Sequence, residues 1–242
     1  RVARMSPWML FGGTAGALMV ATQSLTTPVL GVALFTVALV GGQAVGSLLI
    51  DSRGLGTMAP NPLSPMRLLG AALALLAVIW SVSDPLGCDV AWWMLVVPFV
   101  AGAGTSWQQA ANGQLRRESH SVLSATFVSF VAGTVALLIA FAVKAAVAGP
   151  PAALPTEPWL YTGGLIGVVF VALAAALVPF TGVLVYGLAT IAGQLVVALL
   201  LDVVVPLADA HPTIATVGGA ALAIVAVGVA SIRLPRRATG ST

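Results

Sequence analysis

Two apolar stretches of the sequence each carry a glutamine and then, eight residues later, an aspartate. They are GGQAVGSLLID, with Gln43 and Asp51, and AGQLVVALLLD, with Gln194 and Asp202. Eight residues of helix span about 12 Å, so an aspartate at the membrane surface places its glutamine near the middle of a hydrocarbon core about 30 Å thick. There an amide can bind a polar small molecule or hydrogen-bond to a neighbouring helix. Both glutamines are therefore candidate substrate ligands, and both aspartates are candidate gating or ion-coupling groups.

The segment TSWQQAANGQLRR adds three more candidates. Gln108 and Asn112 are four residues apart and share one helix face, and Trp107 adjoins Gln108. Two amides and an indole suit a neutral or weakly polar metabolite better than a strong ion, so we place them in the same midplane cavity as Gln43 and Gln194. Membrane helices also use such side chains to join helices, and this alternative stays open. For the hydroxyl residues of 121–134, which form no single stripe, joining helices is the favoured interpretation.

The remaining reactive groups do not indicate an enzyme. No Asp, Glu, Lys or Arg lies in the middle of an apolar stretch, so no buried carboxylate for proton coupling is visible. His120 and His211 fall in predicted loops, and the sequence contains no phosphate-binding glycine loop and no nucleophile–base pair. A single cysteine, Cys88, excludes an internal disulfide. The sequence predicts a protein without catalytic residues, metal or cofactor.

The composition assigns the chain to membranes. Of its 242 residues, 59% are hydrophobic and only 7% are charged, whereas soluble domains carry roughly 25% charged residues. Because backbone groups in lipid must be satisfied internally and period-2 alternation is absent, we expect an all-α polytopic membrane protein. Eight apolar stretches are long enough to span a bilayer. They lie near 8–26, 29–50, 66–83, 91–113, 121–143, 159–177, 180–201 and 213–232.

The segments between these stretches place the charges on one side. TTPVLG and LVPFTG are expected to be tight turns, after the first and the sixth stretch. If the chain crosses the membrane at every stretch, nine of the ten Lys and Arg residues share the side of the N-terminus, and only Lys144 lies on the other. The basic side is cytoplasmic in membrane proteins, so both termini are predicted to be cytoplasmic and nucleic acid is not expected as a partner. The nine are Arg1, Arg4, Arg53, Arg67, Arg116, Arg117, Arg233, Arg236 and Arg237.

The sequence also contains an internal repeat. Residues 7–51 and 158–202 align without a gap at an offset of 151 residues, and GAALALLAV (70–78) resembles GAALAIVAV (219–227). The first three predicted helices thus correspond to the last three, which gives a repeating unit of five helices. An odd-numbered unit inserts upside down in its second copy, as in many transporters. We expect a ten-helix inverted repeat, with 1–90 as the last three helices of a first unit whose first two are absent, and 91–242 as the complete second unit.

Four motifs carry a family resemblance: WQQAANGQLRRES, VSFVAGTVALL, the Pro-Trp opening with its glycine pair, and the Gly-Gln helix that ends in Asp. Together they resemble the YdcZ-type membrane proteins of the drug/metabolite transporter superfamily. The resemblance implies a small multi-pass transporter, an exporter, in the inner membrane of a bacterium. The related small multidrug transporters carry a glutamate in their first helix, whereas amides stand here, which argues against cation–proton exchange of that kind. The motif positions implied are Ser129, Gln43, Gln108, Asn112, Gln194, Asp51 and Asp202.

We therefore expect a secondary transporter that exports a small metabolite or drug-like molecule by alternating access at a midplane cavity between inverted repeats. Its partners are a small-molecule substrate and the lipid bilayer, and a homo-oligomer is left open. The alternative is a non-transporting membrane scaffold or assembly partner. Such a protein would use small-residue pairs such as Gly12 and Gly16 for close packing, and the amides to join helices.

Overall fold

The structure is a computed structural model that describes residues 7–55, 60, 64–81, 92–149, 156–204 and 214–232. Within these ranges every regular element is helical, so the all-α prediction is confirmed. The α-helices are α1 (Pro7–Leu10), α2 (Gly12–Ser52), α3 (Pro65–Ser81), α4 (Val96–Ser119), α5 (Val122–Ala148), α6 (Thr162–Thr181), α7 (Val183–Val204) and α8 (Ile214–Ser231). Two short 3-10 helices, η2 (Trp92–Leu95) and η3 (Pro158–Tyr161), precede α4 and α6.

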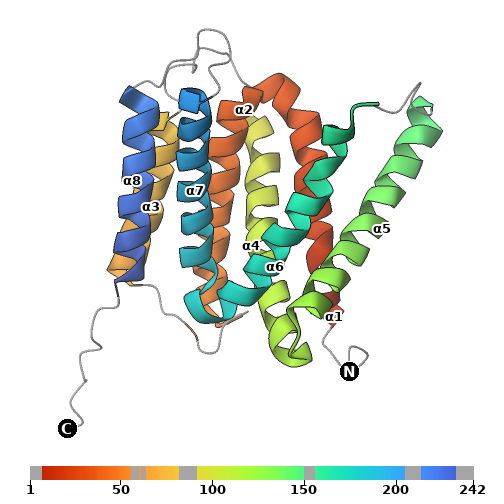
Figure 1. The fold of residues 1–242 in the computed structure, drawn as a ribbon, viewed down its shortest axis with the longest axis horizontal. Coiled ribbons are helices and arrows are strands. Elements are labelled where there is room, and N and C mark those ends of the chain that lie inside the picture. Colours follow the sequence, from red (N-terminus) through yellow and green to blue (C-terminus); the bar gives the residue numbers. More distant parts are fainter. Residues whose placement is uncertain are drawn as a thin grey trace.

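α2 replaces two predicted spans and the turn between them. The sequence predicts a break at TTPVLG, but the helix continues for 41 residues with Pro28 inside it. A straight helix of that length would extend about 60 Å, twice the hydrocarbon thickness. Instead α2 rises from the N-terminal end of the bundle, bends at the opposite end and descends again (Figure 1). The predicted break at a tight turn is therefore wrong, although the chain does reverse its direction, within a bent helix that contains a proline.

The two arms of α2 lie on opposite sides of α4. In the first arm, Gly12 and then Gly16 meet successively earlier positions of α4, so this arm runs antiparallel to it. In the second arm, Gly42 and then Gly46 meet successively later positions, so this arm runs parallel to α4. The two arms therefore run in opposite directions, as expected for two successive spans of a chain that crosses the membrane at each span.

The turn between α6 and α7 is confirmed. Gly182 ends α6 with φ of 85°, and its N–H donates to the carbonyl of Val178 at 2.9 Å. A side chain would be strained at this φ, which explains the glycine. α7 begins at the next residue, Val183, so the turn fixes where the first free N–H groups of α7 point.

The helices stand side by side in one bundle, with the N-terminal end of the described chain and the C-terminal ends of α4 and α8 at the same end (Figure 1). The described basic residues follow the same division. Arg53 and Arg67 flank the connection from α2 to α3, Arg116 and Arg117 lie in the last turn of α4, and Lys144 lies near the opposite end of α5.

Three helical segments in the described part of the chain are long and apolar enough to cross a membrane by these criteria alone: Phe35–Ser52, Val122–Val147 and Thr162–Thr181. Shorter apolar helices cover Pro65–Trp80, Val183–Val197 and Val217–Ser231. α4 falls outside both groups because its C-terminal half is less apolar: it is rich in amides and carries two arginines in its last turn. The described residues form eight α-helices, but these differ from the eight predicted spans, because α1 is separate and α2 contains two of them.

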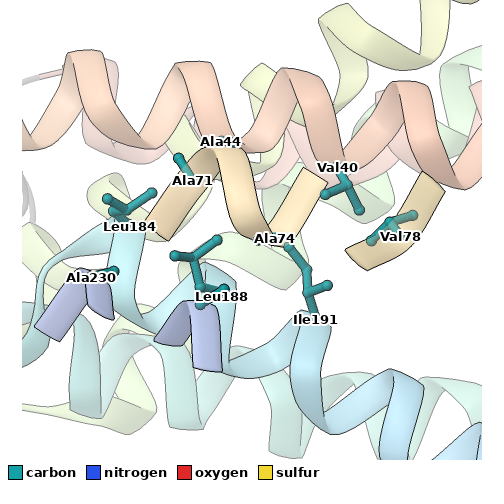
Figure 2. Close-up of a cluster of buried hydrophobic side chains, with 10 residues drawn as sticks. Val40, Ala44, Ala71, Ala74, Val78, Leu184, Leu188, Ile191 and Ala230 are labelled. Atoms are coloured by element: carbon teal, nitrogen blue, oxygen red, sulfur yellow. The ribbon is translucent and has the colours of Figure 1, made fainter. Parts of the chain in front are cut away.

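One apolar core joins α2, α3, α7 and α8. Figure 2 shows its side chains meeting from the four helices, with Leu184 and Leu188 of α7 between alanines of α3 and α8. Small residues bring α3 and α8 into close contact, since a methyl group on Gly70 would lie 2.6 Å from the Cβ of Ala230. At the other end of this pair, Gly218 meets the ring of Trp80, so the two helices are antiparallel.

Candidate functional site

Asp51 is a fully buried carboxylate in the last turn of α2, with 0% of its side chain exposed. It accepts hydrogen bonds from the backbone N–H of Val183, at 2.8 Å to Oδ1, and of Leu184, at 3.1 Å to Oδ2. It also forms an ion pair with the guanidinium of Arg67 in α3. We name these four residues the Asp51 clasp.

The Asp51 clasp satisfies groups that would otherwise lack partners. Val183 and Leu184 are the first two residues of α7, and the first N–H groups of a helix have no acceptor within it. The positive end of the helix dipole also favours a carboxylate there. Arg67, with only 10% of its side chain exposed, balances the charge of a carboxylate buried by protein. The clasp therefore joins α2, α3 and α7 at the end of the bundle where the N-terminus lies.

From the sequence, Asp51 is predicted to lie at the membrane surface, and Arg67 serves only to predict which side of the membrane is cytoplasmic. The structure places Asp51 at the end of its helix, as expected, but beneath protein. Sequence reasoning missed the partners, because backbone N–H groups have no residue signature and Arg67 lies beyond a polar loop. Asp202 lies in α7, and its side chain is outside the described residues. At the offset of 149 residues that relates 70–78 to 219–227, the counterpart of Arg67 is Thr216, so the charge pair is not repeated in the sequence.

Gln43 belongs to a polar cluster between the second arm of α2, α4 and α7. The hydroxyl of Ser106 in α4 donates to the backbone carbonyl of Gln43 at 2.8 Å and is hydrogen-bonded to Ser47 at 3.0 Å. The amide of Gln43 points toward α7, since a methyl group on Gly187 would lie 3.2 Å from its Nε2. We name Gln43, Ser47 and Ser106 the serine–glutamine cluster. Sequence reasoning did not select either serine, although Ser47 lies one helical turn after Gln43.

Gln108, Asn112 and Ser129 form a second cluster, the amide cluster, between the first arm of α2, α4 and α5. The Nε2 of Gln108 donates to the hydroxyl of Ser129 at 3.3 Å. A methyl group on Gly16 would lie 2.9 Å from the same Nε2, so this glycine makes room for the amide. Asn112 and Ser129 are both buried. Gln108 and Asn112 therefore lie on one face of α4, as their spacing predicted.

The two clusters lie on opposite faces of α4. Ser106 and Gln108 are two residues apart, which is about 200° around a helix. Trp107, between them, points to a third face, where it packs in an apolar cluster with residues of α6 and α7 such as Val178 and Tyr186. The structure thus brings Gln108, Asn112 and Ser129 together and separates them from Gln43.

Gln109 is a buried amide next to Gln108, and it points about 100° away from that residue around α4. Its Oε1 has no hydrogen-bond partner among the described residues, and neither does the buried hydroxyl of Thr126 in α5. A buried acceptor of this kind is a site for a water molecule or a ligand donor. In the same part of the chain, no three His, Cys, Asp or Glu residues gather as metal ligands.

Gln194 lies near the middle of α7 and is exposed, like its neighbour Gly193. A methyl group on Gly193 would have no described atom within 4 Å. Gln43 is half-buried, so the two glutamines matched by the repeat have different surroundings.

Comparison with known proteins decides the family. The model of the family described as "Putative inner membrane exporter, YdcZ" matches residues 1–80 and 93–229. The chain belongs to this family. The matched ranges contain the Asp51 clasp and both polar clusters, so all three lie in the YdcZ region of the chain. A search of curated proteins finds no match.

Membership in the YdcZ family confirms the resemblance drawn from the four motifs. The family is one of inner-membrane exporters rather than of enzymes, so the chain is a membrane protein of the exporter class. The family description names no substrate.

Proposed function

We propose that this YdcZ-family protein is a secondary transporter that exports a small neutral or weakly polar molecule by alternating access between two inverted repeats. The observation that carries the proposal is the Asp51 clasp. Asp51 and Arg67 belong to the first unit, 1–90, whereas Val183 and Leu184 belong to the second, 91–242. The clasp is thus a bond between the units at one end of the bundle, where a gate would have to open and close.

The packing of α3 and α8 supports the inverted repeat. These helices carry the matching segments 70–78 and 219–227, and they lie antiparallel against each other. A twofold axis in the membrane plane relates its paired helices in this way. We propose two units of five helices, with the clasp end and both termini in the cytoplasm, in agreement with the arginines at that end.

The two repeat-matched glutamines are proposed to bind the substrate. Gln43 lies about 12 Å along α2 from Asp51 and points toward α7. Gln194 lies on α7 itself, so the proposed path runs between the second arm of α2 and α7. Breaking the Asp51 clasp would free the start of α7 and open this path to the cytoplasm, and Asp202 would act at the opposite end. Gln108, Asn112, Ser129 and Trp107 are proposed to contribute from the other faces of α4.

Transport in proteoliposomes tests this function. Saturable flux of at least one compound is expected from a panel of neutral and weakly polar metabolites. Replacing Gln43 or Gln194 with Leu should lower the rate roughly tenfold, because a ligand hydrogen bond is lost. Phe127→Leu, at an exposed position of α5, is the matched control and should leave the rate unchanged. No saturable flux for any compound, with both glutamine variants folded and unchanged, contradicts the proposal.

A scaffold or assembly role is the second candidate, and one observation favours it. In both clusters, polar side chains on different helices are hydrogen-bonded to each other. This is the arrangement expected of side chains whose only role is to join helices. For a scaffold, Gln43→Leu should lower the melting temperature while the protein transports nothing. For a transporter, the rate should fall more than the stability.

A further inference from the structure

The Asp51 clasp surrounds both oxygens of a carboxylate with donors from other helices. The N–H of Val183 donates to Oδ1 at 2.8 Å, and the N–H of Leu184 donates to Oδ2 at 3.1 Å. The Nη2 of Arg67 pairs with the same Oδ2. α7 and α3 thus supply every one of these donors, and α2 supplies only the carboxylate. The donors form a template for a carboxylate that does not depend on the rest of α2.

Arg67 has a donor that Asp51 does not use. Its Nε is buried and has no hydrogen-bond partner among the described residues, and its side chain is only 10% exposed. A buried N–H without an acceptor is unfavourable. A free carboxylate can bind a guanidinium through two parallel N–H donors, whereas the side chain of Asp51 is fixed to α2 and reaches only Nη2. A free carboxylate therefore fits the donors of the clasp at least as well as Asp51 does.

The positive charge at this end of the bundle exceeds the charge of Asp51. The first N–H groups of a helix carry about half a positive elementary charge, and Arg67 adds a full one, so the clasp without Asp51 would hold about 1.5 positive charges. Leaving Arg67 buried without a partner is strongly unfavourable. Movement of Asp51 out of the clasp, as the proposed opening requires, therefore leaves a site that favours another anion.

Two further arginines lie close to the clasp along the chain. Arg53 is exposed and follows Asp51 by two residues. Arg116 of α4 lies over the ring of Phe180, 5.0 Å from its centroid, and Phe180 precedes Val183 by three residues. A surface with positive charge raises the local concentration of small anions. The same end of the bundle thus attracts the kind of ion that the clasp can bind.

We infer that the Asp51 clasp is an exchange site for a small carboxylate anion, which replaces the side chain of Asp51 when the clasp opens. The inference rests on the opening of the clasp in the proposed function. The incoming carboxylate accepts from the N–H groups of Val183 and Leu184 and binds Arg67 through Nε and Nη2.

The anion acts as a regulator of the gate and is distinct from the transported molecule. Asp51 occupies the donors in the closed state, where Val183 and Leu184 are also buried, so the anion binds only the open state. A ligand that binds one of two states shifts the equilibrium toward that state. A higher concentration of the anion therefore favours the open clasp.

Chemical rescue of Asp51→Ala tests the site, with formate, the smallest carboxylate, as the probe. The variant lacks the carboxylate and keeps its donors. Sodium formate should raise its melting temperature in detergent with saturation, by about 3 °C or more at about ten times the half-saturating concentration. Sodium chloride at the same ionic strength should raise it less, because a single ion does not supply two oxygens.

The matched control for this rescue is the double variant Asp51→Ala with Arg67→Gln. It should lose most of the response to formate, because the guanidinium is absent. Equal shifts for the single and the double variant would overturn the site. Equal shifts with formate and with chloride would overturn its assignment to a carboxylate.

The protein with Asp51 intact tests the exchange, including the case in which Asp51→Ala fails to fold. Val183→Cys, combined with Cys88→Ser, places one thiol at the start of α7, where Val183 is fully buried. Formate should raise the rate at which a water-soluble maleimide labels this thiol severalfold above the rate in chloride. Adding Arg67→Gln should abolish the difference between the two salts.

A labelling rate that formate leaves unchanged would overturn the exchange. Neither measurement depends on flux. Loss of the proposed transport and loss of the anion site are therefore told apart.

Discussion

The Oδ1 of Asp51, in the last turn of α2, lies 2.8 Å from the backbone nitrogen of Val183, the first residue of α7, although 132 residues separate them. The carboxylate thus acts as a cap for a helix in the other half of the molecule. A negative carboxylate is unfavourable at the C-terminal end of α2, which is the negative end of that helix's dipole. The positive N-terminal end of α7 and the charge of Arg67 offset this cost.

Replacing Asp51 with Leu should lower the free energy of unfolding by about 3–5 kcal/mol, because Arg67 is left buried without its partner. Two N–H groups of α7 also lose their acceptor. Thermal unfolding in detergent measures the loss. Arg53→Leu, at an exposed position two residues on, should change stability by no more than about 0.5 kcal/mol. A stable Asp51→Leu variant would mean that the clasp does not hold the helices together.

Combining Asp51→Asn with Arg67→Gln should cost less than the sum of the two single changes. Removing both charges leaves neither one buried alone, and contacting residues couple by about 0.5–3 kcal/mol. A double-mutant cycle of unfolding free energies measures the coupling. The double variant should stay less stable than the natural protein, because an amide caps α7 less well than a carboxylate. Strict additivity would contradict the ion pair.

Gly42→Ala should destabilise the protein by about 1–3 kcal/mol, because the added methyl group collides with the backbone of Phe99 and forces α2 away from α4. The matched control is Gly228→Ala in α8, where no described atom lies within 4 Å. There the change should be neutral or stabilise by up to about 1 kcal/mol, from helix propensity alone. Unfolding measured in parallel checks the contrast, and equal effects would contradict the close approach.

Gln109→Met should leave stability unchanged or raise it, because it removes a buried acceptor that has no partner in the described part of the chain. The melting temperature and the transport rate, measured on the same preparation, separate two roles. A rate that falls while stability holds assigns Gln109 to the substrate path. A melting temperature that falls instead would show that a water molecule or another residue satisfies the amide.

The sequence was informative where pattern alone decides structure. Apolar length predicted helices, Gly182 predicted the turn before α7, and the spacing of Gln108 and Asn112 predicted their shared face. It failed at Pro28, which lies inside one bent helix instead of marking a break between two. It could not show that Gln43 and Gln108 lie on opposite sides of α4, because a helix face does not identify its neighbours. The acceptor role of Asp51 was also hidden, since its donors are backbone groups far along the chain.

Gene duplication tends to make the two halves of a transporter equivalent, and equivalent halves would give its inward-open and outward-open states the same energy. In the proposed inverted repeat the two halves differ at one such position, because Arg67 has Thr216 as its counterpart. The charge pair joins α2 and α3 at one end of the bundle, and the aligned residues of the second repeat do not reproduce it. In the alternating-access mechanism proposed above, the clasp end is expected to be closed at rest, because that end carries the Asp51–Arg67 pair.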